Sequence, residues 1–200
     1  MGSTEPNRSS TRVVLCQQTD KVTAVPYSTP GDPDRRFVDL RAHPELIEHI
    51  RELTGRAPMR EQVELLNSAG SPFFSIGCES AVSEIRKLDA QPTWKCTSYV
   101  QFAFVDPASC EIENYEGLAR ALHEALDTKA DRACDRLVEL EPDPIALRRA
   151  ERQAWSLSIW TSCYAADADS SVREWAECMD AQNVVLRSWI GKGSSGAMGV

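Results

Sequence analysis

The sequence predicts an α+β protein, in which a small, mainly antiparallel sheet of about four strands is covered by helices and followed by a helical C-terminal half. Three observations favour this class. Residues 112–140 keep acidic and apolar side chains in helical phase. Residues 94–105 alternate as a strand does. Pro142 and Pro144 separate this helical pattern from a second one.

The N-terminal part of the chain is expected to hold short elements. Residues 12–16 and 22–25 are β-branched runs joined by polar residues, which suggests a hairpin. Residues 26–33 contain three prolines, which remove backbone donors and fix φ, so we expect a loop there. Pro44 and Pro58 each stand where a helix would begin, and they predict a short helical pair.

Two strands are expected in the middle of the chain. Residues 72–79 have the composition of one strand, and residues 94–105 form a longer one. The longer strand carries Phe102 and Tyr99 on opposite faces, so we expect it near the centre of the sheet. Residues 80–88, between the two strands, are expected to form a helical excursion.

Three helices are predicted after these strands. The long segment 112–140 is followed by a return helix over residues 145–164 and a last helix over residues 172–190. Ser171 and Glu174 form a capping box, which predicts the start of the last helix.

The domain organisation follows from the ends of the chain. Residues 1–11 are polar, and residues 191–200 are rich in glycine and serine, so both are expected to be flexible tails. The sequence between them shows no linker or repeat, which predicts a single domain over residues 12–190.

Acidic residues are concentrated in one segment. The net charge is −8, and residues 106–143 alone hold 11 acidic against 4 basic residues. On a helix over residues 112–140, six carboxylates would share an arc of about 100°. Like charges three and four residues apart destabilise a helix, so a cationic partner could explain the series. The predicted partner-binding residues are Glu113, Glu116, Glu124, Asp127, Asp131 and Asp135.

This arc predicts a non-enzymatic intracellular binding protein, such as an inhibitor, an immunity-type protein or an adaptor, that engages a basic protein surface. A nucleic-acid backbone would be repelled by the same charges. The alternative interpretation is a solvated face, or one that is neutralised internally when Arg148, Arg149 and Arg152 fold back onto Asp135 and Glu139.

Two other functions compete with this one. A small-molecule-binding protein or enzyme could use a pocket beside Trp94, Trp155 and Trp175, with Cys78 as a nucleophile and His123 as its base. Glu79 would oppose such a thiol by raising its pKa, and a buried core cysteine is the simpler interpretation. The third possibility is a structural subunit that self-associates through its C-terminal helices.

Several classes of protein are not expected. The seven cysteines include no Cys-x-x-Cys pair and the three histidines are widely spread, so we predict no metal site and no cofactor. There is no phosphate-binding loop and no dinucleotide fingerprint. The chain shows no apolar run of about 18 residues and no secretory signal, so we expect a cytoplasmic protein without a membrane span.

Overall fold

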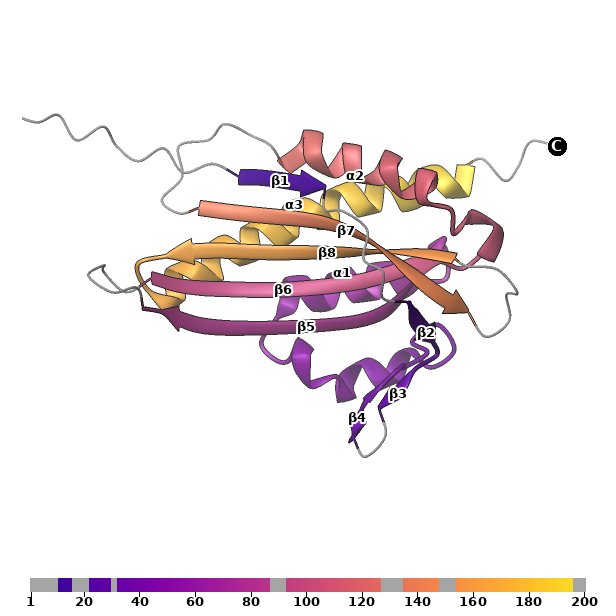
Figure 1. The fold of residues 1–200 in the computed structure, drawn as a ribbon, viewed down its shortest axis with the longest axis horizontal. Helices are drawn as coiled ribbons and strands as arrows, with labels where there is room; N and C mark the ends of the chain where they lie inside the picture. Colours follow the sequence, from indigo (N-terminus) through magenta and orange to yellow (C-terminus); the bar gives the residue numbers. More distant parts are fainter. Residues whose placement is uncertain are drawn as a thin grey trace, which may run out of the picture.

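The structure is a computed structural model, and it describes residues 11–15, 22–29, 32–86, 93–126, 135–147 and 154–195. It confirms the α+β class (Figure 1). The elements in chain order are β1 (Thr11–Leu15), β2 (Thr23–Val25), β3 (Ser28–Thr29), β4 (Asp32–Arg36), the 3₁₀ helices η1 (Pro44–His49) and η2 (Arg51–Leu53), α1 (Ala57–Asn67), β5 (Phe73–Ile85), β6 (Thr93–Phe104), η3 (Pro107–Ser109), α2 (Ile112–Leu126), β7 (Asp135–Leu147), β8 (Ala154–Ala165) and α3 (Ala168–Ser195).

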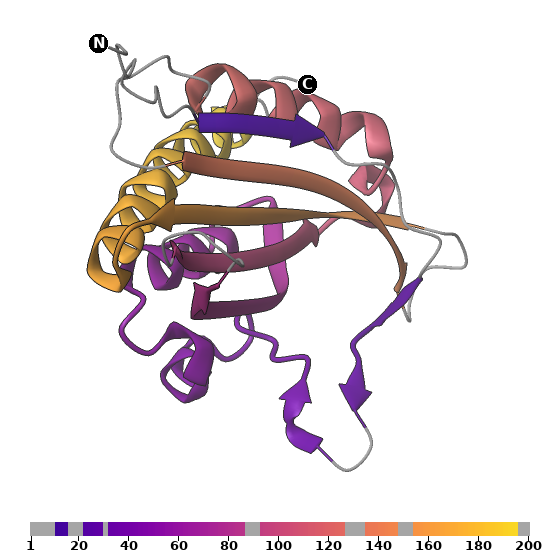
Figure 2. The same cartoon turned by 60° about the vertical axis from the view of Figure 1, so that its left-hand side comes forward.

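The main sheet is mixed and larger than the sequence predicts. Its strand order is β1-β7-β8-β6-β5, and β2 pairs with β7 beyond the end of β1. The pairs β5–β6, β6–β8 and β7–β8 are antiparallel, whereas β1 and β2 run parallel to β7. β3 and β4 form a separate two-stranded unit that projects from the sheet (Figure 2).

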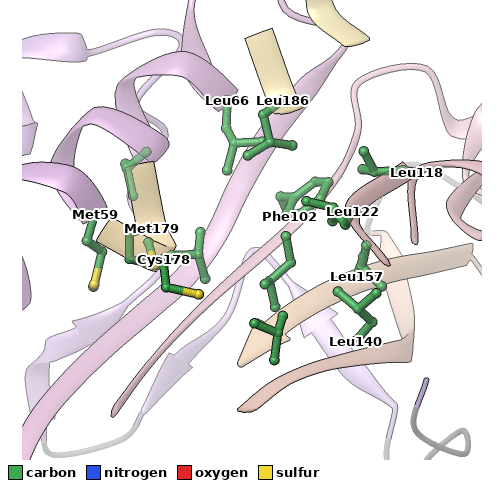
Figure 3. Packing of buried hydrophobic residues seen from close by; sticks show 14 of the residues in the cluster. Met59, Leu66, Phe102, Leu118, Leu122, Leu140, Leu157, Cys178, Met179 and Leu186 are labelled. Atoms are coloured by element: carbon green, nitrogen blue, oxygen red, sulfur yellow. The ribbon is translucent and has the colours of Figure 1, made fainter. Parts of the chain in front are cut away.

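The three α-helices of the described residues pack on one face of this sheet. In Figure 1, α1 and α3 lie behind the strands and α2 lies along the β1 edge. The core lies between the two layers, where α1, α2 and α3 bring apolar side chains against β6, β7 and β8 (Figure 3). Its fully buried members include Met59, Leu66, Phe102, Leu118, Leu122, Leu140, Leu157 and Leu186. No α-helix in the described ranges lies on the opposite face, which we call the open face.

One end of the open face is covered by the segment from β2 to β4. Val25 is buried there against Ile76 and Ala103, and Tyr27 and Phe37 pack around them. The rings of Phe37 and Phe74 meet edge to face, with centroids 6.2 Å apart. The rest of the open face, over the middle of β5 to β8, lies outside this small apolar cluster around Val25.

The predicted continuous helix over residues 112–140 is wrong. α2 ends at Leu126, and the chain is a strand from Asp135 onward. In β7 the buried residues Val138 and Leu140 alternate with the outward-facing Glu139, so the pattern there has a period of two. Residues 127–134, which include Asp127 and Asp131, lie outside the described residues.

The predicted helix over residues 145–164 is also wrong, so the C-terminal half is not mainly helical. These residues belong to β7 and β8. In β8, Leu157 and Ile159 face the helices while Ser156 and Ser158 face the other way. The serines let this strand lie with one face in the core and the other against polar neighbours.

Two prolines are accommodated within β7 because of its neighbours. β1 pairs with residues 136–140 of β7 and β2 with residues 145–147. Pro142 and Pro144 fall between these stretches, where no described strand needs an N–H on that side. Proline is tolerated at such a position, so it does not end the strand.

A buried ion pair between Arg136 and Glu174 connects β7 to α3. Arg136 is 4% exposed. Its Nε donates to Glu174 Oε2 at 3.1 Å, and its Nη2 donates to the same oxygen and to Glu177 Oε2. Because Glu174 is also buried, each charge depends on the other for solvation.

Several N-terminal predictions are confirmed in part. Strands form at β1 and β2, but they pair with β7 and not with each other, so the predicted hairpin is wrong. The expected loop holds β3 and β4. The helical pair is confirmed as η1 with η2, and α1.

Two boundaries also differ from those predicted. β5 continues to Ile85, so the helical excursion is wrong as far as residue 86. α3 begins at Ala168, where Asp167 Oδ1 accepts from the Ser170 N–H at 2.7 Å, and not at the predicted capping box. It runs to Ser195, into the predicted tail. None of the described helices combines the length and apolar character needed to cross a membrane.

Candidate functional site

The open face is acidic. Alternation along β5 to β8 places five carboxylates on this face. Among the described residues of these four strands, Lys95 is the one basic residue whose side chain the register puts on the same face. Lys95 Nζ lies 5.7 Å from the ring centroid of Tyr164, at one end of the face. The acidic side chains are Glu79, Asp135, Glu139, Glu141 and Asp143.

Two aromatic side chains stack at the centre of this face. Tyr99 and Trp160 are opposite each other on β6 and β8. Their ring centroids are 4.6 Å apart with 36° between the planes, and both side chains are partly buried. Aromatic faces attract cations, and an adjacent carboxylate strengthens that attraction.

Neutral donors hold the neighbouring carboxylates in place. Trp160 Nε1 donates to Glu141 Oε2 at 3.0 Å. Gln101 Nε2 and Ser158 Oγ both donate to Asp143 Oδ2. Because an indole carries no charge, the bond from Trp160 orients Glu141 without cancelling its charge.

The surroundings of Glu141 shift the pKa of its carboxyl group. Burial raises it above its usual range, and the neighbouring charges of Asp143 and Glu139 raise it further. A cation bound beside Glu141 would lower this pKa again, since an opposite charge favours the ionised form. We call Tyr99, Gln101, Glu139, Glu141, Asp143 and Trp160 the acidic-aromatic site.

A glycine in β5 makes room for two tyrosine hydroxyls next to this site. β5 is irregular between Ser75 and Gly77, which is a β-bulge. A Cβ at Gly77 would lie 3.2 Å from Tyr27 Oη and 3.6 Å from Tyr99 Oη, so the two hydroxyls converge over it. A glycine inside a strand often marks a place where another group approaches the backbone closely.

Of the predicted partner-binding acids that the structure describes, three share α2 and one lies apart from them on the sheet. Glu113, Glu116 and Glu124 are exposed on α2, in the helical layer. Asp135 is exposed at the start of β7, where alternation puts it on the open face. Arg148, Arg149 and Arg152 lie outside the described residues, and the residues that flank them, Leu147 and Ala154, stand at the end of the β7–β8 hairpin away from Asp135.

The proposed thiol pair is also separated. Cys78 is in the middle of β5, at one edge of the sheet, whereas His123 is exposed on α2, which packs near β1 and β7 at the other edge. Burial raises the pKa of Cys78 to about 12, and Glu52 and Glu79 contribute to the rise. The thiol therefore stays protonated at neutral pH, which does not suit a nucleophile.

The three tryptophans of the predicted pocket lie apart. Trp94 on β6 pairs with Ala165, the tenth residue of β8 after Trp155, so about 33 Å of strand separates the two ends. Trp175 is buried and its Nε1 donates to Ser98 Oγ at 2.8 Å. Trp160 and Tyr99 are not among the predicted site residues, although the alternation of serines in β8 places Trp160 on the polar face.

A pocket does exist elsewhere, between η1 and α1. It has a volume of about 320 Å³ and an apolar floor that includes Leu40, Ile47 and Val63. At its rim, Arg41 Nη1 donates to the carbonyl oxygens of Ser71 and Phe73, each at 2.9 Å. These bonds connect the segment before η1 to the turn after α1 and to the start of β5.

The outer face of α3, which the self-association hypothesis needs, is mostly charged. Arg173, Glu177, Asp180 and Arg187 are exposed there, and the large apolar residue among them is Val184, at 62% exposed. Self-association through this helix stays a prediction.

No protein-family model, curated protein or solved structure matches the chain.

Proposed function

We propose that this chain is a non-enzymatic binding protein, of the inhibitor or adaptor kind, whose acidic-aromatic site engages a basic segment of a protein partner. One observation carries the proposal. The stacked Tyr99 and Trp160 lie beside Glu141 on an open sheet face, and neutral donors hold the neighbouring carboxylates. The proposal keeps the basic partner expected from the sequence and moves its binding surface from α2 to the sheet.

Arginine and lysine side chains fit this site chemically. A guanidinium can stack on an aromatic face while it donates to a carboxylate, and an ammonium can do the same as a point charge. The net charge of −8 would speed the encounter with a basic partner. Phosphate groups would be repelled, so a nucleic acid is a poor candidate. Binding would act by covering the basic surface of the partner.

Selection from a random peptide display library tests this proposal. We expect the wild-type protein to enrich sequences rich in arginine and lysine. The double variant Glu141→Gln/Trp160→Thr should bind the enriched peptides at least about tenfold more weakly, because it loses both a carboxylate and an aromatic face. Fluorescence anisotropy of the labelled peptides measures the change.

The control is a variant of the other acidic surface, Glu113→Gln/Glu116→Gln/Glu124→Gln on α2. It removes three charges where the site variant removes one, so a general charge effect would be larger in the control. If the α2 variant binds the enriched peptides with the same affinity as wild type, the proposal is supported. Loss of affinity in the α2 variant alone, or enrichment of peptides without excess basic residues, contradicts it.

A further inference from the structure

β5 is an edge strand, and side chains cap the outward backbone groups of its first half. The Phe73 N–H donates to Ser71 Oγ at 3.1 Å, and the Phe73 carbonyl accepts from Arg41 Nη1 at 2.9 Å. The Ser75 N–H donates to Asn67 Oδ1 at 3.2 Å. The Ile76 carbonyl accepts from the Tyr27 hydroxyl at 3.3 Å. This half of the edge is closed to a further strand.

The second half of the same edge is different beyond Ser80, whose hydroxyl donates to the Glu52 carbonyl oxygen of η2 at 3.1 Å. In an antiparallel ladder, the backbone groups of every second residue point away from the neighbouring strand. After the bulge in β5, these residues are Ser80, Val82 and Glu84, whose N–H and C=O groups point away from β6. Within the ranges that the structure covers, no hydrogen bond reaches the outward backbone groups of Val82 or Glu84. Residues 79–85 also lack the proline and lysine that protect many edge strands.

We propose that this open half of β5 receives an extended basic segment of the partner as an additional strand. The inference rests on the proposed function and specifies how its partner binds. In this mode main-chain hydrogen bonds supply affinity, and alternate side chains of the added strand supply specificity.

Charge complementarity selects a basic segment. Glu79 lies on the open-face side of the edge and is exposed. A side chain directly opposite Glu79 on an added strand would have its Cβ about 4.5–5.5 Å away, so a cationic residue is favoured there and a like charge is disfavoured. Ala81 and Ser83, the next residues on the same side, are small and leave room for long side chains.

The edge leads directly into the acidic-aromatic site. Glu79 pairs with Tyr99 on β6, and Tyr99 stacks on Trp160 on β8. A long basic side chain that enters across Glu79 would therefore reach toward the aromatic pair. Gly77 lies two residues before Glu79, under the hydroxyls of Tyr27 and Tyr99.

Amide hydrogen exchange of the wild-type protein tests the pairing. The probe is the alternating peptide acetyl-Thr-Arg-Val-Arg-Val-Arg-Thr-amide, with glutamate in place of arginine as its control. We expect the Val82 and Glu84 amides to exchange fast in the free protein and to become protected by the arginine peptide alone. The inward amides of Ala81 and Ser83 should be protected throughout. Protection of Val82 and Glu84 in the free protein, or none on binding, overturns the inference.

Val82→Pro supplies a matched variant. It removes one outward N–H and leaves the ladder to β6 intact, whereas Val82→Ala keeps the N–H. We expect the proline variant to bind the arginine peptide at least about tenfold more weakly than the alanine variant. Far-ultraviolet circular dichroism checks that both fold, and if the proline variant does not, the exchange pattern decides.

Two outcomes separate this inference from the proposed function. If Val82→Pro binds as well as wild type while Glu141→Gln/Trp160→Thr does not, the proposed function stands and the edge pairing is wrong. If light scattering shows a dimer that Val82→Pro dissociates, the occupant of the edge is a second copy of this chain, which also overturns the inference.

Discussion

Replacing Arg136 with methionine is expected to lower the free energy of unfolding by about 3–5 kcal/mol. The side chain of Arg136 is buried under α3, and its guanidinium bonds both Glu174 and Glu177. Methionine fills a similar volume but leaves Glu174 buried without its cation. Urea denaturation followed by circular dichroism measures the loss.

The double variant Arg136→Met/Glu174→Leu is the control for this result. Because it removes both charges, it should recover most of the stability that the single variant loses. A single variant within about 1 kcal/mol of wild type would show that β7 does not place Arg136 under α3.

Phe102→Ala is expected to cost about 3–5 kcal/mol, since it opens a cavity between the sheet and the helices. Phe102 is fully buried, and its ring meets that of Phe73 edge to face with centroids 5.1 Å apart. Lys95→Ala on the same strand points to the open face and should cost less than about 1 kcal/mol. Thermal denaturation of both variants compares the two faces of β6, and the reverse order would mean that the faces are wrongly assigned.

The elements that sequence patterns predict well are those with a single consistent signal. Residues 94–105 alternate throughout, and the structure has β6 there with Phe102 and Tyr99 on opposite faces, as expected. Pro58 near the start of α1 and the stripe through Leu66 gave its helix with nearly correct ends.

β7 and β8 were missed because their signals are ambiguous. Leu137 and Leu140 fit a helical stripe that continues from α2, although Val138 and Leu140 also fit a strand. Pro142 suggested the end of an element, but it occupies a stretch of β7 whose outer side no described strand pairs. Which side needs a donor depends on tertiary pairing, and the sequence does not contain that information.

The candidate site was missed for a related reason. The acidic excess of residues 106–143 was visible, and Glu141 and Asp143 belong to it. Their partners Tyr99 and Trp160 come from two other strands, and only the register brings them together. A one-residue shift in either strand would move these rings into the core.

A ¹H–¹⁵N NMR titration of the protein with the arginine peptide tests whether the open sheet face is the binding surface. The indole N–H of Trp160 donates to Glu141 and the side-chain amide of Gln101 donates to Asp143, so both signals should shift as a cation binds. The indole of Trp175 donates to Ser98 inside the core and should stay in place, as an internal reference. A stationary Trp160 signal, with shifts confined to the backbone amides of α2, would mean that the open sheet face is not the binding surface.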